Sequence, residues 1–419
     1  MCRVDDWRGG ATPKRFRAGT HRVVAPSDTV ERVWRLAPAL GITRLANVTG
    51  LDVIGVPVVM ACRPNARSLS VSQGKGLDLD AARASGLMEA TELYHAERIT
   101  LPVKLATYAE LCFTHRLADV RSLPLMAGGS FHPDRRILWI ESFDLLADEP
   151  VWLPHELVHT DFTIPLPTGS GTFAPSSNGL ASGNHLMEAV LQALCEVIER
   201  DAYAVWNAGG AAARERTRID PATVDDPACL GLLEKYRAAG VPVALWEITS
   251  ELGVATFRCE IAGAAPESGR HLPRASGMGC HPSRAVALAR ALTEAAQSRL
   301  TQIAGSRDDM FREAYERIRD VARSPAAWAD HAAERPVRSF RDAPDLGFDT
   351  FEDELAWLLD RLDSAGFNRA LVVDLTQEAY GIPVVRVVVP GLEPLPAGPG
   401  YAPGARVAAA AERDGTEAP

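Results

Sequence analysis

Polar residues follow one face of an otherwise apolar helix predicted between residues 184 and 201. The sequence there is NHLMEAVLQALCEVIERD, and the polar positions at spacings of four, four, four and three are Asn184, Glu188, Gln192, Glu196 and Glu199. At about 100° per residue these side chains fall within a stripe of roughly 120°. Carboxylates aligned beside an apolar surface repel one another unless a cation lies between them. For oxygen ligands the expected cation is Mg²⁺ or Ca²⁺ rather than Zn²⁺.

Two further predicted helices carry polar residues at positions i, i+4 and i+7, which share one helix face. In ARASGLMEATELYHAER these are Ser85, Glu89 and Glu92, and in AVALARALTEAAQSRL they are Arg290, Glu294 and Gln297. Both helices are otherwise small or apolar, so we expect each stripe to face an enclosed polar site. If three such helices surround one nucleotide, their glutamates would coordinate Mg²⁺ and the Mg²⁺ would bind the phosphates. Arginines would then neutralise the remaining negative charge of the phosphates. The alternative is that the stripes are solvated faces with satisfied charges.

These helices lie in three stretches that resemble the signature blocks of the YcaO-domain family, in the family's order. The stretches are SVSQGKGLDLDAARASGLMEATELYHAER, FAPSSNGLASGNHLMEAVLQALCEVIERDA and GMGCHPSRAVALARALTEAAQSRLTQIAGSRDD. They contain the patterns Ser-x3-Glu-x2-Glu, Asn-x3-Glu-x7-Glu-x2-Glu-Arg and Arg-x3-Glu, with every position intact. The resemblance extends over residues 43–392, and together the three patterns are specific.

The resemblance implies an ATP-binding fold with Mg²⁺ that is unrelated to P-loop proteins and protein kinases. It implies that four glutamates hold metal: Glu89, Glu188, Glu196 and Glu199. The matching positions Ser85, Glu92, Asn184, Arg200, Arg290 and Glu294 are expected to contact the nucleotide. Lys75, just before a helix, and Gln192, on the polar stripe, are expected to contact it too. The expected fold class is α+β (mixed α/β), with acidic helices around a Mg-nucleotide site. No residue is assigned as the catalytic acid or base.

Proteins of this family are expected to activate a peptide-bond oxygen by phosphorylation, after which a nucleophile attacks the amide carbon and phosphate leaves. A sulfur donor gives a thioamide, and a Cys, Ser or Thr side chain gives an azoline. The ending GLEPLPAGPGYAPGARV is only loosely similar to the PxPxP terminus of ring-forming members and looks more like that of TfuA-associated members. We therefore expect thioamidation of a ribosomally made peptide, with azoline formation or a non-catalytic ATP-binding regulator as alternatives.

Partners are also inferred from the resemblance: a precursor peptide or protein, a TfuA-like protein, and a second copy in a homodimer. The net charge of −10 over 419 residues argues against nucleic acid and anionic membranes as partners. No apolar run reaches about 20 residues, and the N-terminus lacks a signal-peptide core. The seven scattered cysteines do not suggest a disulfide framework. The protein is expected to be cytoplasmic.

The chain is predicted to divide into an N-terminal lead at residues 1–42, a YcaO domain at 43–392, and a flexible Pro/Gly/Ala-rich tail at 393–419. The lead should contain a helix near residues 29–37, and further helices are expected at 351–365 and in the charged stretch 308–334. Strands are expected at 56–62, within VPVALWEI and VATFRCEIAG, and within RALVVDL and PVVRVVV. The sequence Gly74-Lys75-Gly76 is predicted to be a turn before a helix, where phosphates often bind.

Several other motifs have a structural interpretation that competes with a functional one. His155 to His159 matches HExxH, but extended, proline-bounded segments flank it, whereas a zinc protease needs a long helix there. Cys195 could reach the acidic stripe, although a buried core thiol is the preferred interpretation. Cys280 and His281 are expected to be loop residues. Arg299 faces away from Arg290 and should pair with an acidic residue on a neighbouring element.

Overall fold

The computed structural model describes residues 10–262, 274–313, 315–316, 335–396 and 400–416. Its helices and antiparallel sheets form the mixed α/β arrangement expected from the sequence. One supersecondary unit contains α2 (Pro26–Leu36), β1 (Arg44–Asn47), β2 (Val58–Cys62), β3 (Val71–Lys75) and α3 (Leu79–Glu97). Its strands pair in the order β1-β2-β3, and α3 packs on the sheet. The carboxylate of Asp78 accepts the N–H of Ala81 at 2.8 Å and so begins α3.

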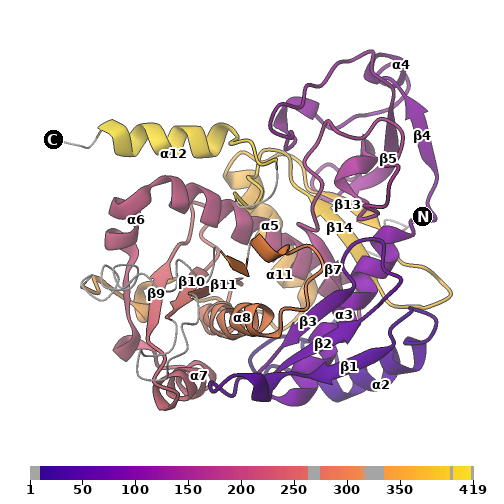
Figure 1. Ribbon diagram of the computed structural model, residues 1–419. Helices are drawn as coiled ribbons and strands as arrows, with labels where there is room; N and C mark the ends of the chain where they lie inside the picture. Colours follow the sequence, from indigo (N-terminus) through magenta and orange to yellow (C-terminus); the bar gives the residue numbers. More distant parts are fainter. Residues whose placement is uncertain (1–9, 263–273, 314, 317–334, 397–399, 417–419) are drawn as a thin grey trace.

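The same order of elements occurs a second time. It consists of α7 (Pro227–Ala238), β9 (Val243–Glu247), β10 (Thr256–Ile261), β11 (Ala275–Cys280) and α8 (Arg284–Ala304). Here too the strands form a three-stranded antiparallel sheet, in the order β11-β10-β9, and α8 packs against β11. The two units lie on opposite sides of the lower half of Figure 1. The fold therefore contains a diverged internal repeat that the sequence analysis did not detect.

Glycines fix the helix–sheet distance in both units. A Cβ atom added at Gly74 in β3 would lie 2.0 Å from the carbonyl oxygen of Ala82 in α3. A Cβ atom added at Gly279 in β11 would likewise lie 2.0 Å from the carbonyl oxygen of Ala287 in α8. Each residue of the second pair is numbered 205 positions after its counterpart, and Glu294 stands 205 positions after Glu89. The repeat thus places the acidic faces of α3 and α8 at the same height above their strands.

A larger sheet carries the central helix α5 (Leu186–Ala208). Its strands are β4 (Val103–Ala106), β5 (Ile137–Asp144), β6 (Glu149–Pro154), β7 (Leu180–Ser182), β13 (Leu371–Asp374) and β14 (Val384–Val388). One face of α5 is buried against β7, β14 and α11 (Phe351–Ser364), through side chains such as Val190, Leu194 and Ile198. Burial of that apolar face orients the polar stripe of α5 away from the core.

Short elements connect these layers. They are α4 (Tyr108–Leu111), α6 (Gly210–Thr217), β8 (Ile219–Asp220), β12 (Arg338–Ser339), α12 (Ala405–Thr416) and the 3-10 turns η1 (Thr49–Leu51), η2 (Val120–Ser122), η3 (His155–Leu157), η4 (Pro221–Thr223) and η6 (Phe340–Asp342). No helix in the described ranges is both long enough and apolar enough to span a membrane.

Two local expectations from the sequence are wrong. Gly74 and Lys75 lie in strand β3 rather than in a turn, because each is paired in register with β2. The tail, predicted to be flexible from its composition, forms helix α12 over residues 405–416, and this helix packs against α5. Most of the charged stretch 308–334 lies outside the described residues. The boundaries proposed for the lead, the domain and the tail stay predictions.

Candidate active site

One cavity of about 480 Å³ lies between α3, α5, α8 and strand β3. Its wall includes all of the residues that the sequence assigned to metal or nucleotide binding: Lys75, Ser85, Glu89, Glu92, Asn184, Glu188, Gln192, Glu196, Glu199, Arg200, Arg290 and Glu294. The expectation that the three stripes meet in one enclosed site therefore agrees with the geometry. The separate roles given to these residues remain predictions.

The stripe of α5 crosses the centre of the cavity and is held by cations and backbone groups. Arg200 lies 3.1 Å from a carboxylate oxygen of Glu199 and 3.7 Å from one of Glu196. Glu188 is 3% exposed and accepts the backbone N–H of Val23 at 2.9 Å. These contacts fix the carboxylate orientations before any ligand arrives, which reduces the reorganisation needed on binding.

The helices α3 and α8 present equivalent carboxylates. Glu89 accepts the backbone N–H of Gln73, and Glu294 accepts the N–H of Met278 at 3.3 Å. In each unit the donor stands 16 positions before the acceptor. Glu294 also pairs with Lys75 of the first unit at 2.6 Å, which joins the two repeats across the cavity. Both carboxylates are thus oriented by the edge strand of their own sheet.

Burial shifts the titration of the acidic residues. Removal from water raises the pKa of Glu89 to about 7, that of Glu92 to about 8 and that of Glu199 to about 7, and neighbouring carboxylates add to each rise. For Glu294, burial also favours the neutral form, but Lys75 and Arg200 outweigh it and lower the pKa. A site with several buried carboxylates that resist ionisation is suited to a divalent cation, which would favour their charged forms.

The cavity also fits a nucleotide. Three buried polar atoms on its wall, Oγ1 of Thr20, Nε2 of Gln73 and Oε1 of Gln192, have no hydrogen-bond partner among the described residues. Since buried polar groups are normally paired, these atoms are available to a polar ligand. Lys75, Arg200 and Arg290 supply positive charge on the same wall. Arg290 is oriented by a 3.0 Å hydrogen bond from its Nη1 to the carbonyl oxygen of Cys280.

The N-terminal lead forms part of the cavity, which the sequence analysis missed. Residues Ala18, Gly19, Thr20 and Arg22 line it, and Nε of Arg22 lies 3.5 Å from Glu188. Burial lowers the pKa of Arg22, and Glu188 opposes that shift. The lead has no helical or strand periodicity, so no spacing pattern marked Arg22 as a site residue.

Other polar residues of the wall were not assigned to the site from the sequence, among them Gln73, Ser182 and Gln297. Ser182 donates through its N–H and its hydroxyl to Glu92, at 2.8 and 2.7 Å. Gln297, which the sequence places on the stripe of the third helix, donates to the carbonyl oxygen of Gln73 at 2.8 Å. The spacing of Gln297 indicated its position, whereas the strand residues Gln73 and Ser182 carried no periodic signal.

A second group of possible metal ligands lies behind the lead. The ligand atoms of His21, His281 and Glu354 are within 4.8 Å of one another. However, Nδ1 of His281 accepts the N–H of Ser283 at 2.9 Å, so the proton of the neutral ring is on Nε2, the nitrogen facing Glu354. Lys14 forms a buried ion pair with Glu354 and supplies the positive charge there. The group is therefore an anchor for the lead rather than a metal site.

The discounted motifs have structural roles. His155 begins a 3-10 turn rather than a long helix, and Glu156 accepts the N–H groups of Thr172 and Phe173 at 3.2 and 3.0 Å. Cys195 is 2% exposed within the core, as preferred from the sequence.

Cys280 ends β11 and is fully buried, so the prediction of a loop residue is wrong for it. His281 lies in the connection between β11 and α8, as predicted, and is buried there. Arg299 pairs with Asp52 at 2.9 Å on the face of α8 opposite Arg290, which confirms its separate role.

Comparison with known proteins gives the same family as the signature blocks. Residues 73–393 match the model of the family described as YcaO cyclodehydratase, ATP- and Mg²⁺-binding. A protein encoded in the tfuA 3′ region of Rhizobium leguminosarum bv. trifolii is 35% identical over 391 residues, covering 91% of each chain. An uncharacterized protein of Methanothermobacter thermautotrophicus is 37% identical over 382 residues, covering 89% of this chain and 95% of its own.

Solved structures share the fold. YcaO from Methanopyrus kandleri, bound with AMPPCP and Mg²⁺, superposes with a TM-score of 0.72 at 23% identity, covering 94% of this chain and 98% of its own. A heterocyclase in complex with substrate and cofactor gives a TM-score of 0.73 at 24% identity, covering 93% of this chain and 55% of the heterocyclase. The family description gives the cofactors as ATP and Mg²⁺, in agreement with the donor set of the cavity. The chain belongs to the YcaO family.

Proposed function

We propose that this protein activates a backbone amide of a peptide by ATP- and Mg²⁺-dependent O-phosphorylation, and that the product is a thioamide. The observation that carries the proposal is the single cavity in which carboxylates of α3, α5 and α8 converge with Lys75, Arg200 and Arg290. An amide oxygen is a poor leaving group, and when bound, Mg²⁺ and ATP supply the phosphoryl group that makes it a good one.

The residues of the cavity act by position and charge. Glu89, Glu188, Glu196 and Glu199 would hold Mg²⁺, since buried carboxylates are the ligands that this ion prefers. Arg200 and Arg290 would neutralise phosphate oxygens, and the hydroxyl of Ser85 would donate to one. Lys75, already 2.6 Å from Glu294, fixes the strand edge that closes the site. Stabilisation of this kind is what phosphoryl transfer mainly requires from a protein.

Thioamide formation rather than ring formation is supported by the curated relative from the tfuA 3′ region, which matches along 91% of both chains. A TfuA-like partner would then deliver sulfur as the nucleophile. Within the described residues, the wall of the cavity contains neither cysteine nor histidine, in keeping with a nucleophile brought from outside. A homodimer, inferred from the resemblance, is part of the same proposal and is tested by the mass of the protein in solution.

Azoline formation by cyclodehydration is the second candidate, because the matching family model is described as a cyclodehydratase. The two reactions share amide activation and differ in the atom that attacks. A third candidate, a regulator that binds ATP without turnover, is disfavoured by the intact set of buried carboxylates. Such carboxylates cost stability in the absence of a cation, so a protein that does not use them has no reason to retain them.

The deciding experiment is mass spectrometry of a candidate peptide co-expressed with this protein, a TfuA-like protein and a sulfur source. Replacement of oxygen by sulfur adds about 16 Da, whereas cyclodehydration removes about 18 Da. The first result supports the proposal, and the second assigns the protein to the azoline formers. An unmodified peptide, together with ATP binding but no turnover stimulated by peptide, would favour the regulator.

Glu199→Gln is the matched catalytic variant. Glu199 is 7% exposed at the centre of the stripe, and its amide analogue keeps the shape while removing the charge. We expect turnover of ATP to fall at least about 100-fold, as for loss of one electrostatic group in other active sites. Glu31→Gln, on the exposed face of α2, serves as the control and should leave turnover unchanged. Equal turnover in both variants would place the site elsewhere.

A further inference from the structure

The cavity has two unlike ends, and strand β3 runs between them. Val71 and Lys75, at the two ends of β3, both line the cavity and are separated by about 13 Å of extended chain. At the Lys75 end the wall is formed by Leu77 and by the lead, where Gly19 lies against Leu77. At the Val71 end the wall is formed by Leu69, Leu93 and Arg307. One end is therefore closed by the lead, and the other is apolar apart from Arg307.

The cations divide unevenly between these ends. Lys75 lies at the closed end, whereas Arg307, at the Val71 end, is engaged in an ion pair with Asp309. The closed end is thus the place for the anionic nucleotide, and the apolar end accepts an uncharged chain. An uncharged amide that is to be activated must approach the site from the Val71 end.

An exposed apolar group of side chains lies beside that end. Four residues form it, here named the rim patch: Phe162, Ile164, Leu166 and Phe311, which are 42%, 93%, 51% and 73% exposed. Single exposed apolar residues are common on protein surfaces, but a group of large ones next to a site marks a region of contact with a partner.

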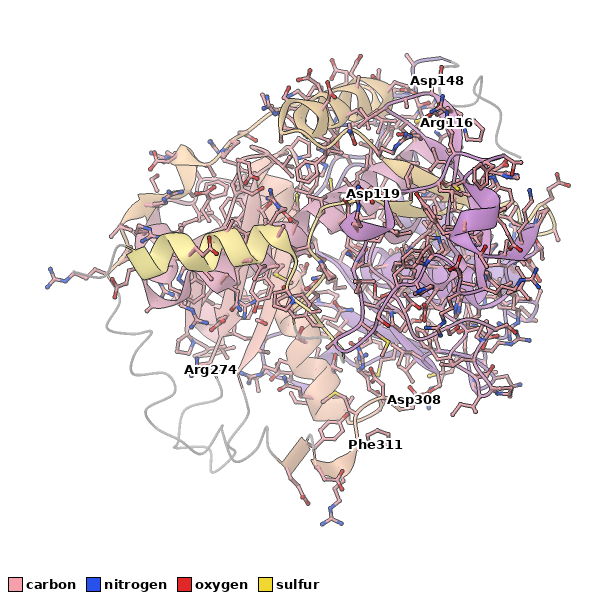
Figure 2. The ribbon with its side chains drawn as sticks, turned by 90° about the horizontal axis from the view of Figure 1, so that it is seen from above. Arg116, Asp119, Asp148, Arg274, Asp308 and Phe311 are labelled. Atoms are coloured by element: carbon pink, nitrogen blue, oxygen red, sulfur yellow. The ribbon has the colours of Figure 1, made fainter. Side chains whose placement is uncertain are left out.

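Hydrogen bonds connect the segments that carry the rim patch to the cavity wall. The N–H of Phe162 donates to the carbonyl oxygen of Arg67 at 3.0 Å. The N–H of Ser70 donates to Asp308 at 3.1 Å, and Asp308 and Phe311 lie near each other at the margin of the molecule (Figure 2). Leu69, between Arg67 and Ser70, lines the cavity. Both parts of the patch therefore flank the same segment of the wall.

Strand β3 offers backbone groups along the same path. It is the edge strand of its sheet. The N–H of Gly76 donates to the carbonyl oxygen of Pro57, and the N–H of Arg63 donates to that of Ser70. These two bonds show which residues of β3 direct their backbone groups toward β2. In an antiparallel ladder the intervening residues direct their N–H and C=O groups to the free edge. Val71, Gln73 and Lys75 are these residues, and all three line the cavity. The N–H of Gln73 already donates to Glu89 and its carbonyl oxygen accepts from Gln297, so Val71 is the edge residue nearest the rim patch whose backbone can meet a ligand.

We propose that the rim patch and the Val71 end of β3 form the docking surface for an extended, apolar segment of the substrate peptide, next to the amide that is modified. This inference rests on the proposed function, since it places the peptide of that reaction. The apolar side chains of the peptide contact Phe162, Ile164, Leu166 and Phe311. Its main chain meets the edge of β3 at Val71 and continues into the cavity toward the carboxylates.

The test uses the full-length protein, Mg²⁺, AMPPCP and a pool of random twelve-residue peptides displayed on phage. One selected peptide is synthesised with a fluorescent label, and its affinity is measured by anisotropy for the wild type, Ile164→Asp and Phe311→Asp. Val53→Asp is the control, because Val53 is 70% exposed beside Asp52, which pairs with Arg299 on the face of α8 turned away from the cavity. Binding of AMPPCP to each variant, measured separately, reports whether the fold and the nucleotide end are intact.

We expect the selected peptides to be rich in apolar residues and to bind at least tenfold more weakly to Ile164→Asp and Phe311→Asp, with unchanged affinity for Val53→Asp and for AMPPCP. Equal affinity for all four proteins, or a pool from which no peptide prefers the wild type to Ile164→Asp, overturns the inference. Dimerisation of the wild type that Ile164→Asp abolishes would also overturn it, because the patch would then be a contact between two copies.

The outcomes separate this inference from the proposed function. If a modified peptide is obtained in the co-expression experiment and its KM is the same for the wild type and Ile164→Asp, the function stands and the docking surface is wrong. If selected peptides lose affinity in Ile164→Asp, but neither they nor the co-expressed peptide are ever modified, the docking surface stands and the proposed reaction is wrong.

Discussion

The buried acidic residues of the cavity destabilise the fold when they are ionised, unless a cation binds them. Glu89, Glu92 and Glu199 are held in surroundings that raise their pKa values to about 7, 8 and 7. Because the unfolded chain ionises them near pH 4.5, deprotonation favours unfolding as the pH rises from about 5 to 8. These carboxylates therefore stabilise the cation-free fold at low pH, and the stabilisation is lost as the pH rises through the folded-state pKa values.

Mg²⁺ should reverse this trend, because it binds the ionised carboxylates. We expect the increase in Tm produced by Mg²⁺ with AMPPCP to be larger at pH 8 than at pH 6. Thermal unfolding followed by circular dichroism at both pH values measures it. The same experiment on Glu89→Gln should show a smaller difference between the two pH values. An increase in Tm that is independent of pH would contradict this account of the site.

At this scale the sequence predicted well wherever a helix supplied the period. Glu188, Glu196 and Glu199 could be placed on one face because the spacing along α5 fixes their direction. Arg22 and Gln73 could not, since one lies in an irregular segment and the other on a strand whose facing residue, in α8, is more than 200 positions away. Contacts of that kind depend on the tertiary fold alone.

Among the elements, the paired strands and helices of the repeat impose the tightest packing. Gly279→Ala would place a methyl group 2.0 Å from the backbone of α8, so β11 and α8 must separate. We expect the free energy of unfolding to fall by about 1–3 kcal/mol or more, the usual cost of overpacking. Chemical denaturation measures this change, and a drop in Mg-nucleotide affinity should accompany it because Glu294 lies on the same helix.

Gly231→Ala is the matched control for that substitution. Gly231 lies in helix α7 with no heavy atom within 4 Å of an added Cβ. Alanine should therefore stabilise the protein, by about 0.5–1 kcal/mol, through its higher helix propensity. Opposite signs for the two glycine variants would support the packing argument, and a loss of stability in both would point instead to a general intolerance of alanine.

The elements themselves were predicted unequally. Helix α11 and strands β13 and β14 are confirmed to within a few residues, because long apolar patterns set them. The sequence Gly74-Lys75-Gly76 was read as a turn because glycine is common in turns. In the structure glycine is needed at position 74 for a different reason, the close approach of α3, which no local pattern reveals.

At the scale of the whole molecule, the C-terminal segment anchors α5 through contacts with Asp201. Arg406 donates to both oxygens of the fully buried Asp201, at 2.7 and 2.8 Å. Glu393 accepts the N–H groups of Gly404, Arg406 and Val407 at 2.9, 3.1 and 3.2 Å, and so begins α12. Asp201 directly follows Arg200, so the tail supports the helix end that carries the site. Its composition suggested none of this, since Pro and Gly are frequent in flexible chain too.

Arg406→Met should leave Asp201 buried without its charged partner, with only the N–H of Glu393 still donating to it at 3.0 Å. We expect a loss of about 3 kcal/mol in the free energy of unfolding, as for other broken buried ion pairs. Arg17→Met is the control, because Arg17 pairs with Asp349 at the surface and should contribute at most about 1 kcal/mol. Urea denaturation of both variants measures the difference, and similar small losses would mean that the tail is not an anchor.

The repeated unit also bears on how such a site acquires a direction. Two identical units would present the same side chains to the cavity between them. A symmetric site of that kind would bind an elongated ligand equally well in either orientation. Here the positions of Ser85 and Glu92 in α3 are taken in α8 by Arg290 and Gln297, whereas Glu89 has its like in Glu294. Divergence after duplication has thus kept one matched pair of acids and made the flanks unequal. Fusing the two units in a single chain lets their sequences drift apart, which an assembly of two identical subunits could never do.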